Sequence, residues 1–380
     1  MTSAWSYCDR SDRGYGLFKR RIFQALEKLG WTVALAEVPL LDASAKAVLR
    51  EHLDQNAPDW IFLINQSAGQ FYDYLELPRE RRPYATRKFV WYLDDPHFFV
   101  DRPFEPLEHV FSFDETYLDY LREFTPNVCG FFPLAADLET PGAWDSRYAC
   151  EVSFVGGVID QSERRARLSS EMRDYVGRLV DLHLQSRHKT FFELAGEYPI
   201  APGKRIQITP PVAHYLYWEA NNQYRLRVVQ ALADFDLRIY GNEDWLPLLQ
   251  NTPLAGRYGG PIDPARELPA VFASSAVNLN IHSRQCRGSL NQRDFNAPLA
   301  GGFLLSDWVP AAGRYFIPGE EAVYWSDLDD LRRKTAYYLA HPEEREKIIQ
   351  RGRERVSREH AYDKRVEEWL RIMRSTLDSF

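Results

Sequence analysis

The chain alternates short apolar runs with longer stretches in which apolar residues recur at helical spacing. Residues 14–29 show that spacing, and Gly30 follows as a helix-ending glycine. In the first third of the chain, apolar runs predict strands over residues 31–38, 59–64, 88–93, 109–113 and 127–131. Strands that are apolar nearly throughout and separated by helices indicate a parallel sheet covered on both faces.

Proline and glycine interrupt this pattern at about residues 133–148, which we interpret as a linker. The alternation then resumes, with strands predicted over 150–155, 237–241, 276–281 and 303–305. Helices are predicted over 161–233, interrupted at 198–211, and over 327–377, broken at 341–342 and 358–361. The sequence therefore predicts an α/β protein with two Rossmann-like domains and an active site in the cleft between them.

We assign residues 1–140 to the first domain, 149–358 to the second, and 359–380 to a C-terminal helix that packs back on the first. The length of 380 residues is itself too great for one ordinary core. Hydrophobic residues at 45% and charged residues at 27% describe a globular chain. The net charge of −7 argues against a nucleic-acid partner, which would need a basic face.

Neither targeting signals nor cysteine spacing points to a specific function. The N-terminus lacks the pattern of a signal peptide, and no apolar run is long enough to span a membrane, so we expect a cytoplasmic protein. The four cysteines are far apart in the sequence and show no metal-ligand spacing: Cys8, Cys129, Cys150 and Cys286. We interpret them as small buried side chains in a reducing compartment.

The segment from Gly288 to Asp307 is the most informative part of the chain. A polar turn leads into a short helical run, Gly301 and Gly302 stop the run, and an apolar strand follows. Such an arrangement is half of a βαβ unit and directs the N–H groups of a helix start toward an anion. Three arginines lie near this segment in the sequence: Arg284, Arg287 and Arg293. The sequence therefore predicts a diphosphate site, and Asn291 in the polar turn belongs to its candidate residues.

Pro298 stands inside the helical run of this segment. Proline removes one N–H group and crowds the carbonyl four residues earlier. We therefore expect the helix to begin close to Asn296, whose side chain either hydrogen-bonds a ribose hydroxyl or caps the helix.

Two other strand ends carry candidate ligand-binding residues. Gly156 and Gly157 follow one predicted strand, and Tyr240 and Gly241 close another. Paired glycines allow backbone to approach a ligand closely, although a simple tight turn explains them as well. Tyr240 and Gly241 are candidates for holding a base edge or a phosphate.

Asp94, Asp95 and His97 form a third cluster, just past the end of a predicted central strand. Ligand-contacting groups of open α/β sheets lie at such strand ends. A carboxylate and an imidazole there are able to position or deprotonate a hydroxyl group. The alternative is that Asp95 caps the following turn and His97 is a polar loop residue.

Residues 291–307 resemble the donor-site motif of group-1-type glycosyltransferases. The spore-maturation (CgeB-like) branch is the most similar, with a motif that runs roughly Arg-x-Phe-Glu-Ala-x-Ala-x-Gly-x-Phe-Leu-Leu-Thr-Asp. Further similarity lies in Phe154–Gly157, in Leu268–Asn280 and in the tail from Tyr338 to Tyr362. The similarity is good over about 235–377 and fair over about 85–160.

This resemblance implies a GT-B fold and transfer of a sugar from a nucleotide-sugar donor, bound mainly by the C-terminal domain. It also implies a reaction that usually needs no metal or other cofactor and usually retains the anomeric configuration. The family's glutamate, which grips the donor ribose, is Asn296 here, so the contact with ribose loses its charge-assisted strength. The acceptor is open between a glycan, a protein and a small molecule.

In such a metal-free site, our candidates for stabilising the leaving diphosphate are Arg293, Arg287 and the helix start near Asn296, with Arg284 behind them. We expect Asp95 and His97 to face them across the cleft and to hold the acceptor hydroxyl or the donor sugar. An inverting reaction would instead make Asp94 or Asp95 the base. Two alternatives stay open. One is a manganese-dependent glycosyltransferase that binds its metal through Asp94 and Asp95. The other is a catalytically silent protein that binds a nucleotide or glycan.

Overall fold

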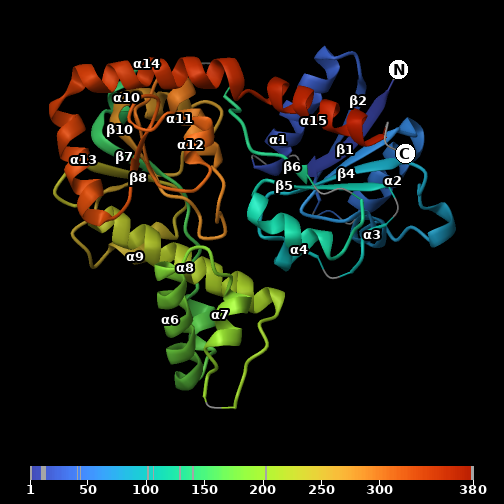
Figure 1. Ribbon diagram of the computed structural model, residues 1–380, viewed down its shortest axis with the longest axis horizontal. Coiled ribbons are helices and arrows are strands. Elements are labelled where there is room, and N and C mark those ends of the chain that lie inside the picture. Colours follow the sequence, from blue (N-terminus) through green and yellow to red (C-terminus); the bar gives the residue numbers. More distant parts are fainter. Residues whose placement is uncertain are drawn as a thin grey trace. The chain divides into compact units, whose positions relative to one another are not determined.

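The computed structural model describes residues 2–9, 14–40, 42, 44–100, 102–105, 107–127, 130–138, 141–201 and 203–377. The chain forms two compact units, and each contains a parallel six-stranded sheet (Figure 1). The first unit comprises Met1–Asp137 and Glu359–Phe380, and the second comprises Leu138–Arg358. The α/β architecture with two parallel sheets is confirmed.

The strands of the first unit pair in the order β2-β1-β3-β4-β5-β6. They are β1 (Ser3–Asp9), β2 (Thr32–Val38), β3 (Trp60–Ile64), β4 (Arg87–Tyr92), β5 (Glu108–Ser112) and β6 (Gly130–Phe131). Its helices are α1 (Tyr15–Lys28), α2 (Ala45–Asn56), α3 (Ala68–Tyr74), α4 (Leu118–Arg122) and α15 (Tyr362–Leu377). Short 3-10 turns are η1 (Arg79–Arg81), η2 (Pro96–Phe98) and η3 (Glu115–Tyr117). β1 is the one strand here that the sequence pattern did not predict.

Both faces of the first sheet are covered, because alternate side chains of a strand point to opposite faces. Ile61 and Val90 belong to a core formed with α2 and α3. On the other face, the ring of Trp369 in α15 packs edge-on against Phe62 and Phe89, with centroids 5.3 and 5.1 Å apart. The last helix is therefore part of the first unit's core.

The strands of the second unit pair in the order β12-β11-β10-β7-β8-β9. They are β7 (Cys150–Val155), β8 (Leu237–Tyr240), β9 (Tyr258–Gly260), β10 (Ser275–Asn280), β11 (Leu304–Asp307) and β12 (Val323–Trp325). After the 3-10 turn η4 (Ser146–Tyr148), the helices up to β8 are α5 (Ser162–Ala166), α6 (Ser170–Gln185), α7 (Phe191–Glu197) and α8 (Pro210–Gln230). The later helices are α9 (Trp245–Leu249), α10 (Leu268–Ser274), α11 (Gln292–Ala300), α12 (Ala312–Tyr315), α13 (Leu328–Ala340) and α14 (Pro342–Glu359).

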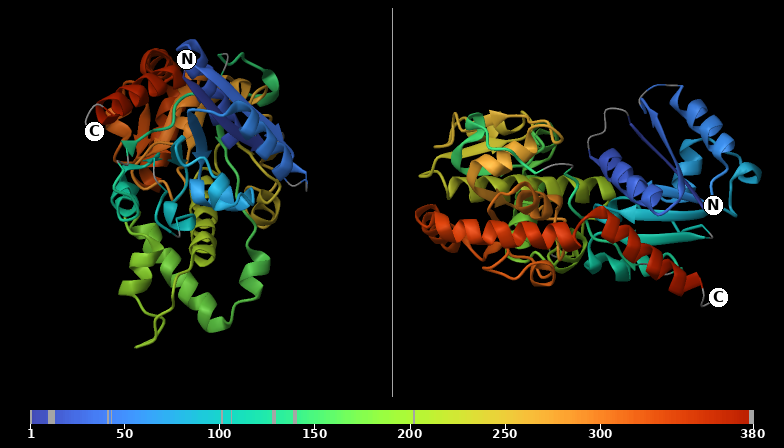
Figure 2. Two further views of the ribbon diagram at one scale, coloured as in Figure 1. Left: turned by 90° about the vertical axis from the view of Figure 1, so that its right-hand side faces the viewer. Right: turned by 90° about the horizontal axis from the view of Figure 1, so that it is seen from above.

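Helix breaks in the second unit follow local chemistry. α7 ends at Glu197 and α8 begins at Pro210, as the interruption at 198–211 predicted. Pro342 occupies the first position of α14, where its missing N–H has no intrahelical partner to lose. α6 and α7 project from the rest of this unit as a helical pair (Figures 1 and 2).

The described cysteines fit their predicted role in part. Cys8 and Cys286 are buried and free, whereas Cys150 is only partly buried. Cys129 lies outside the described residues. No helix in the described ranges is long and apolar enough to cross a membrane.

Candidate functional site

The second sheet has a topological switch point between β7 and β10. These two strands are neighbours, and the chain proceeds from them toward opposite edges of the sheet. Ligands of open α/β sheets bind at the carboxyl ends of the strands beside such a point. α8 ties the two strand-end loops together there, because Asn222 hydrogen-bonds to both N and O of Ile159 at 3.2 and 2.6 Å. Asn221 accepts a hydrogen bond from the backbone N of Arg284 at 2.5 Å.

α11 begins at Gln292, so the prediction that this helix begins close to Asn296 is wrong. Asn291 is its N-cap and accepts a hydrogen bond from the backbone N of Arg293 at 2.8 Å. Asp294 completes a capping box by accepting from the backbone N of Asn291. Pro298 is tolerated near the end of this short helix. Asn296 is therefore a buried residue in mid-helix, and the first N–H groups of α11 are engaged by its own cap.

His282 connects the start of α11 to the end of β11 through two carboxylates, those of Asp294 and Asp307. Its Nε2 lies 2.7 Å from Oδ2 of Asp294, and its Nδ1 lies 2.5 Å from Oδ1 of Asp307. Burial alone would lower the pKa of His282, but Asp294 and Asp307 outweigh it and raise that pKa to about 9. Burial would also raise the pKa of Asp307, yet His282 and Arg187 hold it well below its ordinary value. His282 is therefore a buried cation between two buried carboxylates.

Four arginines surround Asp307, and we call them the arginine cluster: Arg187, Arg225, Arg284 and Arg293. Arg187 pairs directly with Asp307, with Nη2 at 3.0 Å from Oδ2. Arg293 donates from Nε to Oδ1 of Asn280 at 2.8 Å and from Nη2 to the carbonyl of Ile281 at 3.1 Å. Arg225 donates to the carbonyl of Gly157. The cluster therefore joins the ends of β7, β10 and β11.

Positive charge exceeds negative charge in this buried region. The arginine cluster and His282 supply five cations, whereas Asp294 and Asp307 supply two carboxylates, which leaves a net charge of +3 among these described groups. Burial, followed by repulsion from Arg293, lowers the pKa of Arg225 to about 9. Burial and the nearby Arg187 lower the pKa of Arg284 to about 10. Such an excess is unfavourable by itself and is relieved by a bound anion.

The structure brings only part of the predicted diphosphate site into this cluster. Arg284 and Arg293 are members, and Asn291 lies beside them because it donates from Nδ2 to Oδ1 of Asn280 at 3.0 Å. Arg287 instead hydrogen-bonds to the carbonyl of His188.

The strand-end glycines pack the loops against one another. A Cβ on Gly241 would lie 2.4 Å from the carbonyl oxygen of Gly156, and one on Gly157 would lie 2.9 Å from Oδ1 of Asn242. Tyr240 is buried, and its ring packs edge-on against Tyr148. This close packing fits the tight-turn interpretation of the paired glycines, and a ligand role for these four residues stays a prediction.

Asp94, Asp95 and His97 follow β4 in the first unit. Asp95 is buried and caps η2, with Oδ1 accepting from the backbone N of His97 at 3.0 Å and lying 2.6 Å from its Nδ1. His97 stacks on Tyr120 with ring centroids 3.7 Å apart. Asp94 turns to different partners, Asn65 Nδ2 at 2.7 Å and the hydroxyl of Tyr15. The two carboxylates therefore serve separate local networks, as the capping alternative predicted for Asp95.

Several residues of the buried cluster carried no assigned role in the sequence: Arg187, Arg225, His282, Asp294 and Asp307. Arg225 follows Glu219, Asn221 and Asn222 on α8, and all four are buried although they are polar. These polar residues follow the apolar and aromatic run Tyr215–Trp218 on the same helix, and that change was the available signal. Arg187 lies in a turn far from the motif in sequence, and nothing local marks it.

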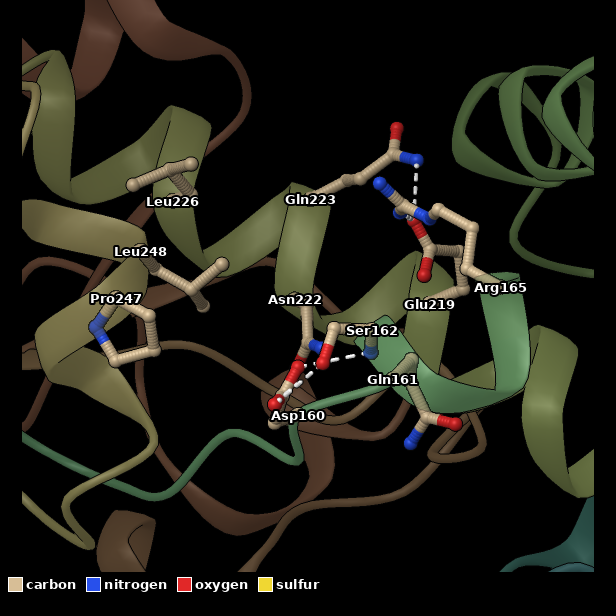
Figure 3. Close-up of a pocket in the computed structure, with 10 residues that line it drawn as sticks. All are labelled: Asp160, Gln161, Ser162, Arg165, Glu219, Asn222, Gln223, Leu226, Pro247 and Leu248. Carbon is tan, nitrogen blue, oxygen red and sulfur yellow. Dashed lines mark hydrogen bonds and ion pairs between the residues drawn. The ribbon is translucent and has the colours of Figure 1, made fainter. Parts of the chain in front are cut away.

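A cavity of about 420 Å³ is lined by the segment that follows β7, by α8 and by α9 (Figure 3). Leu226, Pro247 and Leu248 form one wall, and the ion pair between Arg165 and Glu219 lies across from them. None of the arginine cluster lines this cavity. Arg165 is thus paired with a carboxylate of α8.

Comparison with known proteins agrees with this architecture. Residues 192–371 match the family described as glycosyl transferase-like. No curated protein matches the chain at a significant level. Among solved structures, sucrose-phosphate synthase from Thermosynechococcus elongatus is similar over 100% of both chains, with a TM-score of 0.61 and 12% identity.

Two further solved structures share the fold. HepE (Alr3699) of Anabaena, in complex with UDP and glucose, has a TM-score of 0.54 and 10% identity and is covered over 100% of its length and 99% of this chain. AviGT4, a glycosyltransferase of avilamycin A biosynthesis, has a TM-score of 0.53 and 13% identity and is covered over 98% of its length and 99% of this chain. Residues 192–371 therefore match the glycosyl transferase-like family, and the chain as a whole shares the GT-B fold of these solved structures.

Proposed function

We propose that the protein transfers a sugar from a nucleoside-diphosphate sugar to an acceptor hydroxyl, with retention of configuration and without a metal ion. The second unit binds the donor and the first unit receives the acceptor. The observation that carries this proposal is the net charge of +3 in the buried cluster of Arg187, Arg225, Arg284, Arg293 and His282 with its two aspartates. A diphosphate has the opposite charge and nearly the same magnitude.

The position of this charge supports the proposal as well. The arginine cluster lies at the carboxyl ends of β7, β10 and β11, beside the switch point where α/β sheets bind nucleotides. Guanidinium groups stabilise the charge that develops on a leaving diphosphate without any metal. HepE, which shares the fold, was solved with UDP and glucose. In the retaining reaction the departing phosphate accepts the proton of the acceptor hydroxyl, so no strong base is required.

As part of this proposal we assign roles to the remaining candidates. Arg225 and Arg293 hold the diphosphate, and Asn296 contacts the ribose through its amide. Asp95 and His97 hold the acceptor hydroxyl or the donor sugar. The CgeB-like branch remains our assignment within the glycosyltransferases, on the motif at residues 291–307.

A catalytically silent nucleotide-binding protein is the second candidate. Two observations favour it: Asn296 stands where the resembled motif has glutamate, and Asp95 already caps η2. Such a protein would bind a nucleoside diphosphate and yet consume no donor.

Thermal stability in the presence of nucleoside diphosphates tests the proposal. A ligand that binds the folded state raises the melting temperature in a concentration-dependent way. We expect UDP, GDP, ADP or TDP to do so, and the matching nucleotide sugar to be hydrolysed or transferred equally well with and without EDTA. No shift with any of the four at millimolar concentration would contradict donor binding. Loss of turnover in EDTA would favour the metal-dependent alternative, and binding without turnover would favour the silent one.

A further inference from the structure

The connection between β7 and β8 is much longer than a crossover helix requires. Where α8 alone would join two neighbouring parallel strands, the chain first forms α5, α6 and α7. We call α6, α7 and the turn between them the helical insert. Figure 1 shows the insert projecting from the second unit. Its turn nevertheless contacts the loops that follow β10 and β11.

Arg187, in that turn, makes three contacts with the candidate donor site. Its Nη2 lies 3.0 Å from Oδ2 of Asp307 and donates to the carbonyl of His282 at 3.3 Å. Its Nη1 donates to the carbonyl of Trp308 at 3.4 Å. Arg284 contacts the insert in turn: its Nη2 donates to the carbonyl of His183, near the end of α6, at 2.7 Å.

Asp307 is connected to α11 through His282. Its Oδ1 accepts from the backbone N of His282 at 2.9 Å and faces Nδ1 of the same imidazole. The other side of that imidazole faces Asp294, which also accepts from Ser306 and closes the capping box of α11. A continuous chain of charged contacts therefore runs from the insert to the helix start that carries Arg293.

The middle of this chain is buried, at Asp307, His282 and Asp294, and its two ends are partly buried, so each charge depends on the next one. A buried carboxylate or guanidinium that loses its partner is strongly unfavourable, and the neighbouring groups move to compensate. Arg187 already uses both Nη atoms on protein oxygens. Asp307 is the carboxylate that Arg187 pairs with, so we expect the effect of Arg187 on a ligand to pass mainly through Asp307.

We propose that Arg187 is a positioning residue: through Asp307, it couples the helical insert to the geometry of the diphosphate site. This inference rests on the proposed donor function, because it assigns the insert a role in that same site. The sequence around the motif at residues 291–307 does not indicate that the helical insert contributes to the diphosphate site.

A double-mutant cycle on Arg187 and Asp307 tests the coupling, with the affinity for a nucleoside diphosphate as the readout. The probe is whichever of UDP, GDP, ADP and TDP binds the wild type most tightly. We expect Arg187→Met to raise its Kd by about tenfold or more, the size of one charged hydrogen bond. In the Asp307→Asn background the same substitution should change Kd by less than about threefold, because the partner is already neutral.

Two other variants separate positioning from folding. Arg187→Lys keeps the charge and should restore most of the affinity lost in Arg187→Met. Lys189→Met is the matched control, since Lys189 lies in the same turn but pairs with Glu197 on the surface. It should bind the probe as the wild type does. Should Arg187→Met not fold, Arg187→Gln replaces it in the cycle.

The outcomes distinguish this inference from the proposed function. If the wild type binds no nucleoside diphosphate, the donor function fails and the inference fails with it. If the wild type binds but Arg187→Met binds equally well, only the inference fails. An equal loss in both backgrounds also overturns it, because Arg187 would then act without Asp307.

Discussion

Nε2 of His282 lies 2.7 Å from Oδ2 of Asp294, so an imidazole after β10 holds the carboxylate that closes the capping box of α11. Asp307 holds the other ring nitrogen at 2.5 Å. With a carboxylate on each nitrogen, the ring is most stable when both nitrogens carry protons. The start of the donor-motif helix therefore depends on the charge of one histidine.

This dependence predicts a loss of stability at alkaline pH. The pKa of His282 is raised from its ordinary 6.5 to about 9 in the folded chain by Asp294 and Asp307, which outweigh burial. The stabilisation is fully present below about pH 6.5 and is lost as the pH rises through about 9, in total on the order of 3 kcal/mol. We expect the unfolding free energy of the wild type, measured by urea denaturation, to fall over this range more than that of His282→Gln. Parallel pH profiles for the two proteins would contradict a charged His282.

Arg293 is the second site for a direct test. Its guanidinium lies at the start of α11. Burial is the main cause of the lowered pKa of the neighbouring Arg225, and repulsion from Arg293 is the second cause. If both arginines hold the diphosphate, Arg293→Ala should weaken nucleoside-diphosphate binding by about 1.5–3 kcal/mol, measured by titration calorimetry. Arg238→Ala, an exposed arginine of β8, is the control and should leave affinity unchanged. Unchanged affinity in Arg293→Ala would remove this residue from the donor site.

Most of the fold was predictable because its strands are short and uniformly apolar. Strands were predicted over 59–64 and 150–155 in this way. They correspond to the central strands β3 and β7, in which Trp60–Leu63 and Val152–Phe154 are buried. β1 was missed because Ser3–Asp9 mixes polar and aromatic residues, and tertiary pairing with β2 and β3 decides its conformation. The start of α11 was misjudged because Pro298 was taken as a first-turn residue, although the capping box of Asn291 and Asp294 was present in the sequence.

The candidate site was predictable only in its arginines near the motif. Arg284 and Arg293 lie within the same loop and helix as the motif, so sequence proximity identified them. Arg187 and Arg225 enter from the turn after α6 and from α8, about 60 to 110 residues earlier, and only the folded chain brings them to Asp307. Gly156 and Gly241 show what sequence cannot distinguish, since a glycine at a strand end has the same sequence pattern whether a ligand or another loop approaches it.

Gly302 marks a close approach of backbone within the second unit. A Cβ at this position would lie 2.4 Å from Nδ2 of Asn278 and 2.6 Å from the carbonyl oxygen of Phe272. A carbonyl in a helix cannot easily retreat, so Gly302→Ala should destabilise the protein by about 1–3 kcal/mol in denaturant titration. Gly177→Ala, inside α6 with open space around it, should instead be neutral or stabilising by up to about 1 kcal/mol. Equal stability of both variants would mean that the neighbours of Gly302 shift freely.

Trp369 is the main contact of α15 with the first sheet. Its ring packs edge-on against Trp60, Phe62 and Phe89 at centroid distances of 5.4, 5.3 and 5.1 Å. Trp369→Ala should lower the unfolding free energy of the first unit by about 3–5 kcal/mol, measured by chemical denaturation. Leu29→Ala, an exposed apolar residue in the same unit, should change it by less than about 0.5 kcal/mol. A small effect at Trp369 would show that α15 is dispensable for this core.

Asp95 decides between a catalytic and a structural role for the residues after β4. Asp95→Asn preserves the shape and still accepts the hydrogen bond from the backbone N of His97, but it removes the charge. If Asp95 holds the acceptor or donor sugar, turnover of the nucleotide sugar should fall by about 100-fold or more, with nucleoside-diphosphate affinity unchanged. Asp114→Asn is a matched control, because Asp114 is equally buried and caps η3 through the backbone N of Thr116 in the same way. Equal turnover in the two variants would assign Asp95 to capping alone, and joint loss of turnover and binding in Asp95→Asn would assign it to the structure of the first unit.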